Sequence, residues 1–278
     1  MNRRAVLAVA RKDIRAVTAN LQVWLPMVLV PLILGVAVPL GMVLAFRYGA
    51  EGLSAADVRT LIGWAERLPA GDLGDALAGL PDLSRRLIYV GANYLLAPFF
   101  LMIPLMAASV ISADSFAGEK ERGTLETLLF APVDMVSLFT GKVLAAFAPA
   151  MGLSLATLLL CAAAVNAAAW PLFHRIIFPQ PNWIPLVLLV IPAVALLAIL
   201  LNVFISARVA TFQAAYQMGG LVVLPMLLLV AGQATGVLVF SVPVVLAVGL
   251  GLWLVDGLLL WLALGRLDRQ QLFAGQVR

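Results

Sequence analysis

Six long apolar stretches dominate the chain, and each is long enough to cross a lipid bilayer as a helix. The hydrocarbon core of a membrane is about 30 Å thick, which a helix of about 20 apolar residues crosses. In lipid, a lone run of this kind must satisfy its own backbone hydrogen bonds, which favours the α-helix. The expected spans are residues 23–46, 89–111, 138–165, 183–205, 214–234 and 242–264.

The composition excludes several classes of protein. The chain of 278 residues is 63% hydrophobic and only 12% charged, whereas soluble domains carry about 25% charged residues. This excludes a water-soluble enzyme and a disordered chain. The single cysteine, Cys161, and the single histidine, His174, exclude an internal disulfide and a multi-histidine metal site. We therefore predict one all-α membrane domain over residues 1–278, with six transmembrane helices and no metal site.

The distribution of Lys and Arg predicts the orientation, because basic residues concentrate in cytoplasmic connections. With six spans, one side of the membrane carries Arg3, Arg4, Arg11, Lys12, Arg15, Lys120, Arg122, Lys142, Arg208, Arg266, Arg269 and Arg278. The other side carries Arg47, Arg59, Arg67, Arg85, Arg86 and Arg175. Both termini are predicted to be cytoplasmic, in the inner (cell) membrane, with the connection 47–88 outside. The net charge of +4 is thus a topology signal, and no nucleic-acid partner is expected.

Residues 1–21 form a predicted amphipathic helix ahead of the first span. Leu7, Ala10, Ile14, Val17 and Leu21 recur at helical spacing, and basic residues flank them. This pattern is typical of a helix that lies in the membrane interface and contacts lipid headgroups. The alternative is a solvated tail that only sets the topology.

The cytoplasmic connection 113–132 carries the most information. Charges alternate in sign from Glu119 to Arg122, which predicts that they stay solvated, and Gly123 ends this run. Thr124 can cap a short helix with its leucines on one face. A helix of this kind is suited to docking a soluble partner or lying on lipid. The residues on which this hypothesis depends are Glu119, Glu121, Arg122, Gly123, Thr124, Leu125, Glu126 and Leu128.

Two motifs resemble a known family. The run Glu121-Arg-Gly-Thr-Leu-Glu-Thr-Leu-Leu-Phe-Ala-Pro-Val133, followed by Gly141-Lys142, resembles the permease subunits of ABC-2 type ATP-driven transporters. The run from Ser206 through Arg208 to Gln217 is similar to that of the sodium-exporter-like, multidrug-type branch.

The resemblance implies a permease that exports a lipid, a peptide, a drug-like molecule or an ion. It also implies that a separate ATPase subunit binds ATP and Mg²⁺, that the region Glu119–Phe130 and Arg208 couple to it, and that two permease copies or homologues assemble. In agreement, Gly141-Lys142 is followed by Val143 and lacks the glycine spacing of a phosphate-binding loop. The chain itself is therefore not expected to be an enzyme or to bind a cofactor.

Asp256 stands inside the last apolar run. An ionisable residue there suggests a function by default, so Asp256 and Asn202 are candidates for a transport pathway. Alternatively, Asp256 pairs with a polar group such as Asn202 or lies shallow enough to reach water.

Two other functions stay open at this point. An intramembrane enzyme would need a facing pair of catalytic groups, and the sequence offers no convincing one. A membrane scaffold or assembly protein without transport activity is the main alternative. An associated ATPase would favour the permease, and purification without one would favour the scaffold.

Overall fold

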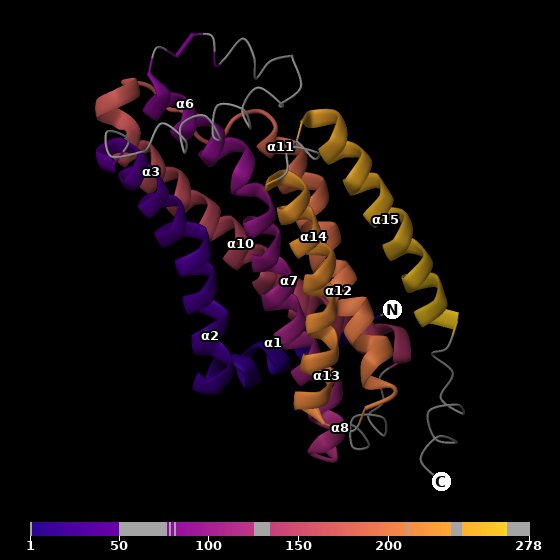
Figure 1. The fold of residues 1–278 in the computed structure, drawn as a ribbon. Helices are drawn as coiled ribbons and strands as arrows, with labels where there is room; N and C mark the ends of the chain where they lie inside the picture. Colours follow the sequence, from indigo (N-terminus) through magenta and orange to yellow (C-terminus); the bar gives the residue numbers. More distant parts are fainter. Residues whose placement is uncertain are drawn as a thin grey trace.

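The computed structural model describes residues 2–49, 77, 79–80, 82–124, 134–209, 211–234 and 241–265. These residues form helices and contain no strand. Figure 1 shows a bundle of long helices, with α1 lying crosswise at the end that also holds α8. We name this the α8 end, and the opposite one, which holds α6 and α11, the α6 end.

The helices follow one another with few breaks. Four of the elements, η1, η3, η4 and η5, are single π-helical turns within longer helices, and η6 is a 3₁₀ turn. In chain order the elements are α1 (Arg3–Ala19), α2 (Leu21–Leu32), η1 (Ile33–Ala37), α3 (Val38–Gly49), α6 (Leu83–Val90), η3 (Gly91–Leu95), α7 (Ala97–Ala113), η4 (Asp114–Gly118), α8 (Glu119–Glu121), α10 (Met135–Phe173), α11 (Trp183–Pro185), η5 (Leu186–Val190), α12 (Ile191–Ser206), α13 (Phe212–Gly219), η6 (Gly220–Val222), α14 (Val223–Ala234) and α15 (Val242–Gly265).

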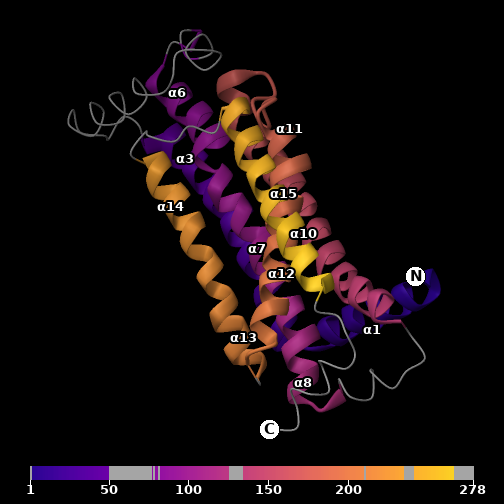
Figure 2. The same ribbon diagram turned by 90° about the vertical axis from the view of Figure 1, so that its right-hand side faces the viewer.

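Five helices among the described residues are long and apolar enough to cross a membrane. They are Val23–Gly49, Leu83–Glu121, Met135–Phe173, Trp183–Ser206 and Val242–Ala263. They contain five of the six expected spans almost completely, and two of them are much longer than expected. The range 214–234 consists of α13, η6 and α14 in succession. Figures 1 and 2 show α13 and α14 running from the α8 end to the α6 end.

The centre of the bundle is α7. Most of its side chains are buried, including Phe100, Leu101, Ile103 and Leu105, each at most 1% exposed. It packs against α10, α12 and α14. Because α7 has almost no free surface, a displacement at either of its ends is passed to the neighbouring helices.

Side-chain caps mark three helix starts at the α8 end. Asn2 Oδ1 accepts from the Arg4 amide at 3.1 Å, and Asp134 Oδ2 accepts from the Ser137 amide at 3.0 Å. Thr211 Oγ1 accepts from the amide of Ala214 at 3.2 Å. Such caps satisfy amides that a helix start leaves without partners.

Asn93 joins the second span to the connection before α11. Its side chain is fully buried, and its Nδ2 donates to Ile177 O at 3.0 Å. Its Oδ1 accepts from the Gln180 amide at 3.1 Å. Its backbone oxygen accepts from Asn182 Nδ2 and Trp183 Nε1, both at 3.0 Å. We call these contacts the Asn93 joint.

The N-terminal helix is present as predicted, from Arg3 to Ala19. Its apolar stripe is divided in two. Ala10 and Val17 are buried, whereas Leu7 and Leu21 are 50% and 63% exposed. The helix packs along the start of α10. Most of the expected connection 47–88, by contrast, lies outside the described residues.

Candidate functional site

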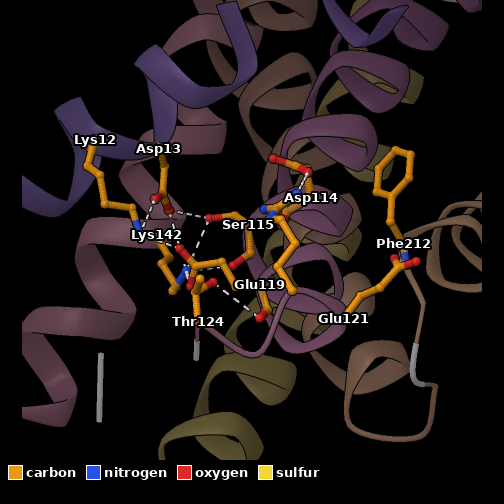
Figure 3. A network of polar contacts seen from close by, with 10 residues as sticks. Lys12, Asp13, Asp114, Ser115, Glu119, Glu121, Thr124, Lys142 and Phe212 are labelled. Carbon is orange, nitrogen blue, oxygen red and sulfur yellow. Dashed lines mark hydrogen bonds and ion pairs between the residues drawn. The ribbon is translucent and has the colours of Figure 1, made fainter. Parts of the chain in front are cut away.

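A group of charged and polar residues, most of them buried, lies at the α8 end, where α1, the end of the second span and the start of α10 meet. We call Lys12, Asp13, Ser115, Glu119 and Lys142 the charged cluster (Figure 3). Asp13, Ser115, Glu119 and Lys142 are each no more than 4% exposed. Burying a charge is costly unless it is paired and hydrogen-bonded, so the contacts within this cluster decide whether it is stable.

Lys142 is the centre of the cluster. Its Nζ lies 2.6 Å from Glu119 Oε2 and 3.5 Å from Asp13 Oδ2. It also donates to the backbone oxygen of Ser115 at 2.5 Å. The ammonium group therefore has an acceptor for each of its three hydrogens. Phe116 covers it, with the ring centroid 5.3 Å from Nζ.

Lys12 closes the cluster from the side of the solvent. Its Nζ is 3.2 Å from Asp13 Oδ1 and donates to Glu119 Oε1. Partial burial lowers the pKa of Lys12, but the hydrogen bond to Glu119 and the negative charges of Asp13 and Glu119 outweigh this effect. The pKa of Lys12 is therefore raised above its ordinary value. Ser115 Oγ donates to Asp13 Oδ2. Two carboxylates thus face two ammonium groups, and the cluster is electrically balanced.

The π-helical turn η4 places neighbouring residues on different sides of the second span. Figure 3 shows Ser115 directed toward Asp13, while Asp114 is directed away from the cluster. Asp114 Oδ1 instead accepts from Arg122 Nη1 at 2.9 Å. A π turn contains one residue more than an α-helical turn and is often found at functional sites.

The segment that follows η4 makes a tight turn. Gly123 has φ +67°, a left-handed conformation that favours glycine. The Thr124 hydroxyl donates back to Glu119 O at 3.2 Å. The helix that Thr124 was predicted to cap falls on Leu125, Glu126 and Leu128, which lie outside the described residues.

The same segment also contacts the connection between α12 and α13. Lys120 Nζ donates to Val209 O at 3.0 Å, and Glu121 Oε2 accepts from the Phe212 amide at 2.8 Å. Arg208 lies in this connection and is exposed. One short stretch of chain is thus bonded to three separate parts of the fold: α1, α10 and the α12–α13 connection.

A comparison with known protein families identifies the family to which this chain belongs. A family model described as ABC-2 family transporter protein matches residues 7–255. The chain belongs to the ABC-2 transporter family. The matched range contains the whole charged cluster. No curated protein and no solved structure matches the chain.

As an ABC-2 permease, the chain is a transmembrane component of an ABC transporter. Permeases of this family typically work with an ATPase subunit. In the described part of this permease, no group of three or more His, Cys, Asp or Glu side chains is placed to hold a metal ion.

One expectation about the permease motif was wrong. The charges from Glu119 to Arg122 were expected to be solvated together, but Glu119 is only 4% exposed. The physical reason is the helical register. Glu119 continues the face of the second span that packs against α1 and α10, whereas Glu121 and Arg122 lie beyond it and are exposed.

Asp256 and Asn202 do not form the pair that was considered as an alternative to a transport role. Asp256 is 1% exposed, and neither of its carboxyl oxygens has a hydrogen-bond partner among the described residues. Asn202 Nδ2 donates to Ala198 O at 3.0 Å, while its Oδ1 has no such partner and faces Gly219 on α13. The burial of Asp256 also contradicts the shallow, water-exposed alternative.

Sequence reasoning missed Lys12, Asp13 and Ser115 as members of the site, and used Lys142 only as part of a motif. A signal for Asp13 was present. Val6, Val9, Ala10, Asp13 and Val17 share one face of α1, and all are buried. An acidic residue on the apolar face of a helix requires a buried cation, and Gly141-Lys142 supplies one.

Proposed function

We propose that this permease is the transmembrane subunit of an ATP-driven exporter, and that the segment 114–124 couples it to a separate ATPase subunit. The observation that carries the proposal is the triple attachment of this segment. A partner that moves it would act on α1, α10 and the α12–α13 connection together. In this proposal ATP and Mg²⁺ are bound by the partner subunit, and two permeases, identical or homologous, complete the transporter.

The charged cluster can transmit a force from the segment 114–124 to the neighbouring helices. Buried ion pairs resist separation, because pulling one partner away leaves an uncompensated charge. Glu119 is bonded to both lysines of the cluster. A push on the exposed residues 121–124 would therefore move α1 and α10 with the second span, without sliding between them.

We place the permease in the inner membrane. The positions of its Lys and Arg residues support an orientation with the α8 end on the cytoplasmic side. That end carries Arg3, Arg4, Arg11, Lys12, Arg15, Lys120, Arg122, Lys142 and Arg208 of the described residues, and the α6 end carries Arg47, Arg85, Arg86 and Arg175. We propose α13–α14 as the sixth crossing, since it runs between the two ends (Figure 2). The run Ser206–Gln217 favours the sodium-exporter-like branch.

We also propose that Asp256 belongs to the transport pathway. It is only 1% exposed, and its carboxyl oxygens have no hydrogen-bond partner among the described residues that would explain it as a structural residue. Polar groups within membrane helices are costly and are commonly functional.

The coupling role is tested by expressing the permease together with its ATPase subunit. Gly123→Val should release the ATPase or abolish its response to the permease, because a β-branched residue in the left-handed conformation costs about 1–2 kcal/mol and redirects the turn. Leu125→Asp should have the same effect. Gly49→Val, at the α6 end and also in open space, is the matched control. Normal co-purification and ATP hydrolysis in both test variants would contradict the proposal.

The main alternative, a scaffold without transport, predicts a different result. A scaffold would purify without any ATPase, and none of these variants would alter ATP hydrolysis in the membrane.

The orientation is tested separately with single cysteines in a Cys161→Ser background. Thr124→Cys and Arg175→Cys place exposed thiols at opposite ends. An impermeant thiol reagent should label only Arg175→Cys in intact cells. Labelling of Thr124→Cys from outside would reverse the proposed orientation.

A further inference from the structure

Three arginines on α1 form an exposed stripe. Arg4, Arg11 and Arg15 are exposed, and none of their guanidinium groups makes a hydrogen bond or ion pair with a described residue. Successive residues in an α-helix are about 100° apart, so these three lie within about 40° of one another. We call them the arginine stripe.

The arginine stripe faces away from the bundle. The buried face of α1 consists of Val6, Val9, Ala10, Asp13 and Val17, and by the same helical geometry its centre is about 160–180° from the stripe. The stripe is therefore separate from Asp13, which lies on the opposite side of the helix, and Lys12 lies between the two, about 80° from the stripe. It faces away from α10 and Glu119.

An exposed apolar strip runs beside the arginine stripe. Leu7 is 50% exposed, and Ile14, seven residues further along α1, lies on the same side and is partly exposed. Basic side chains next to an exposed apolar strip are typical of a helix that lies in the membrane interface. The aliphatic stems of arginine cover apolar surface while their guanidinium groups reach the headgroups.

The position of α1 in the fold fixes its depth. α1 ends at Ala19 and α2, the beginning of the first membrane-capable helix, starts at Leu21. With one residue between them, α1 cannot lie far from the level at which the first span enters the membrane. Figures 1 and 2 show it crosswise to the long helices at that level.

We propose that the arginine stripe binds the phosphate groups of anionic phospholipids in the leaflet at the α8 end. Guanidinium groups bind phosphate through paired hydrogen bonds. Spacings of four and seven residues put the three along one line on the helix, so that several headgroups can be bound side by side. Lipid bound to the stripe would hold the helix that supplies Lys12 and Asp13 to the charged cluster.

The proposal is tested on the purified permease alone, so its outcome is independent of ATPase coupling. Native mass spectrometry measures retention of palmitoyl-oleoyl phosphatidylglycerol against phosphatidylcholine with the same chains. The wild type should retain phosphatidylglycerol preferentially. The variant R4Q/R11Q/R15Q should lose about 10- to 100-fold in phosphatidylglycerol affinity and little in phosphatidylcholine affinity, because each basic residue contributes a similar increment near an anionic surface.

Two controls separate charge from fold. R4K/R11K/R15K keeps the charge and should retain most of the preference, while Arg175→Gln removes an exposed arginine at the other end and should change nothing. If the glutamine variant fails to fold, the proposal is tested on the wild type alone. Its preference for phosphatidylglycerol should fall as KCl is raised from 50 mM to 500 mM, because salt screens exposed charges.

Equal retention of both lipids by the wild type, or a preference insensitive to salt, would overturn the proposal. So would a folded glutamine variant that keeps the phosphatidylglycerol preference. If that variant keeps the preference but loses co-purification with the ATPase subunit, the stripe is a protein-binding surface instead.

Discussion

The permease buries acidic side chains in two places, and the two places differ in whether the carboxyl groups have partners. At the α8 end, Asp13 and Glu119 are each bonded to both lysines of the charged cluster. In α15, Asp256 is equally buried but has no partner among the described residues. A paired cluster joins helices together, whereas a carboxyl group without a partner adds nothing to the packing. The first arrangement is explained by structure alone, and the second is not.

The largest effect is expected from removing the shared cation. Lys142→Met leaves Asp13 and Glu119 facing each other with only half-exposed Lys12 between them. Breaking a buried ion pair on one side costs about 3–5 kcal/mol, so the midpoint of thermal unfolding in detergent should fall sharply. Lys120→Met is the control, since Lys120 bonds only a backbone oxygen. An equal fall in the unfolding midpoint of the two variants would show that the ion pairs of Lys142 do not stabilise the fold more than the single hydrogen bond of Lys120.

The second effect tests the same cluster from the acidic side. Glu119→Gln keeps the size of the side chain and weakens its bonds to Lys12 and Lys142. We expect a loss of about 1.5–3 kcal/mol, the range for hydrogen bonds to charged groups. The double variant Glu119→Gln/Lys142→Met should lose less than the sum of the two single losses, because removing both charges leaves no unpaired one. A strictly additive result would mean that the two residues are not coupled.

The third variant applies the same chemical change at the other site. Asp256→Asn should alter the free energy of unfolding by less than about 1 kcal/mol, because no hydrogen bond of the carboxyl group is lost. Asp256→Leu should unfold no more easily than the wild type. If Asp256 serves transport, both variants should assemble normally and transport less. A loss of stability as large as that of Glu119→Gln would show that Asp256 has a structural partner after all.

The smallest effect concerns the half-exposed member of the cluster. The pKa of Lys12 is raised in the folded state, so the stability it contributes is present below its ordinary pKa of 10.5 and is lost as the pH rises through the higher folded value. After allowance for solvent screening, this contribution is about 0.5 kcal/mol or less. The difference in stability between wild type and Lys12→Met should therefore shrink between pH 9 and pH 12. If the difference in stability grows over this interval instead, the pKa of Lys12 is not raised in the folded state.

Sequence reasoning succeeded where the membrane imposes a single solution. Apolar runs such as Val242–Ala263 must be helical, and the spacing of Leu7, Ala10 and Val17 identifies α1. It failed where partners come from distant segments. Glu119 stands in a run of alternating charges that is typical of a solvated turn, and only the packing of three helices shows that it is buried. Burial alone could be guessed for Asp256, but the absence of a hydrogen-bond partner among the described residues could not.

The Asn93 joint has a consequence for the direction of movement. Parting the second span from the connection at Ile177–Trp183 would break four hydrogen bonds at once, each contributing about 0.5–1.5 kcal/mol. The α6 end of this span is therefore the harder end to displace, while Glu119 lies near its other end. A force applied at Glu119 favours tilting of the span about Asn93 over a piston-like shift along its axis. The side chains of the span would then move farthest near the α8 end and least beside Asn93, which acts as the pivot.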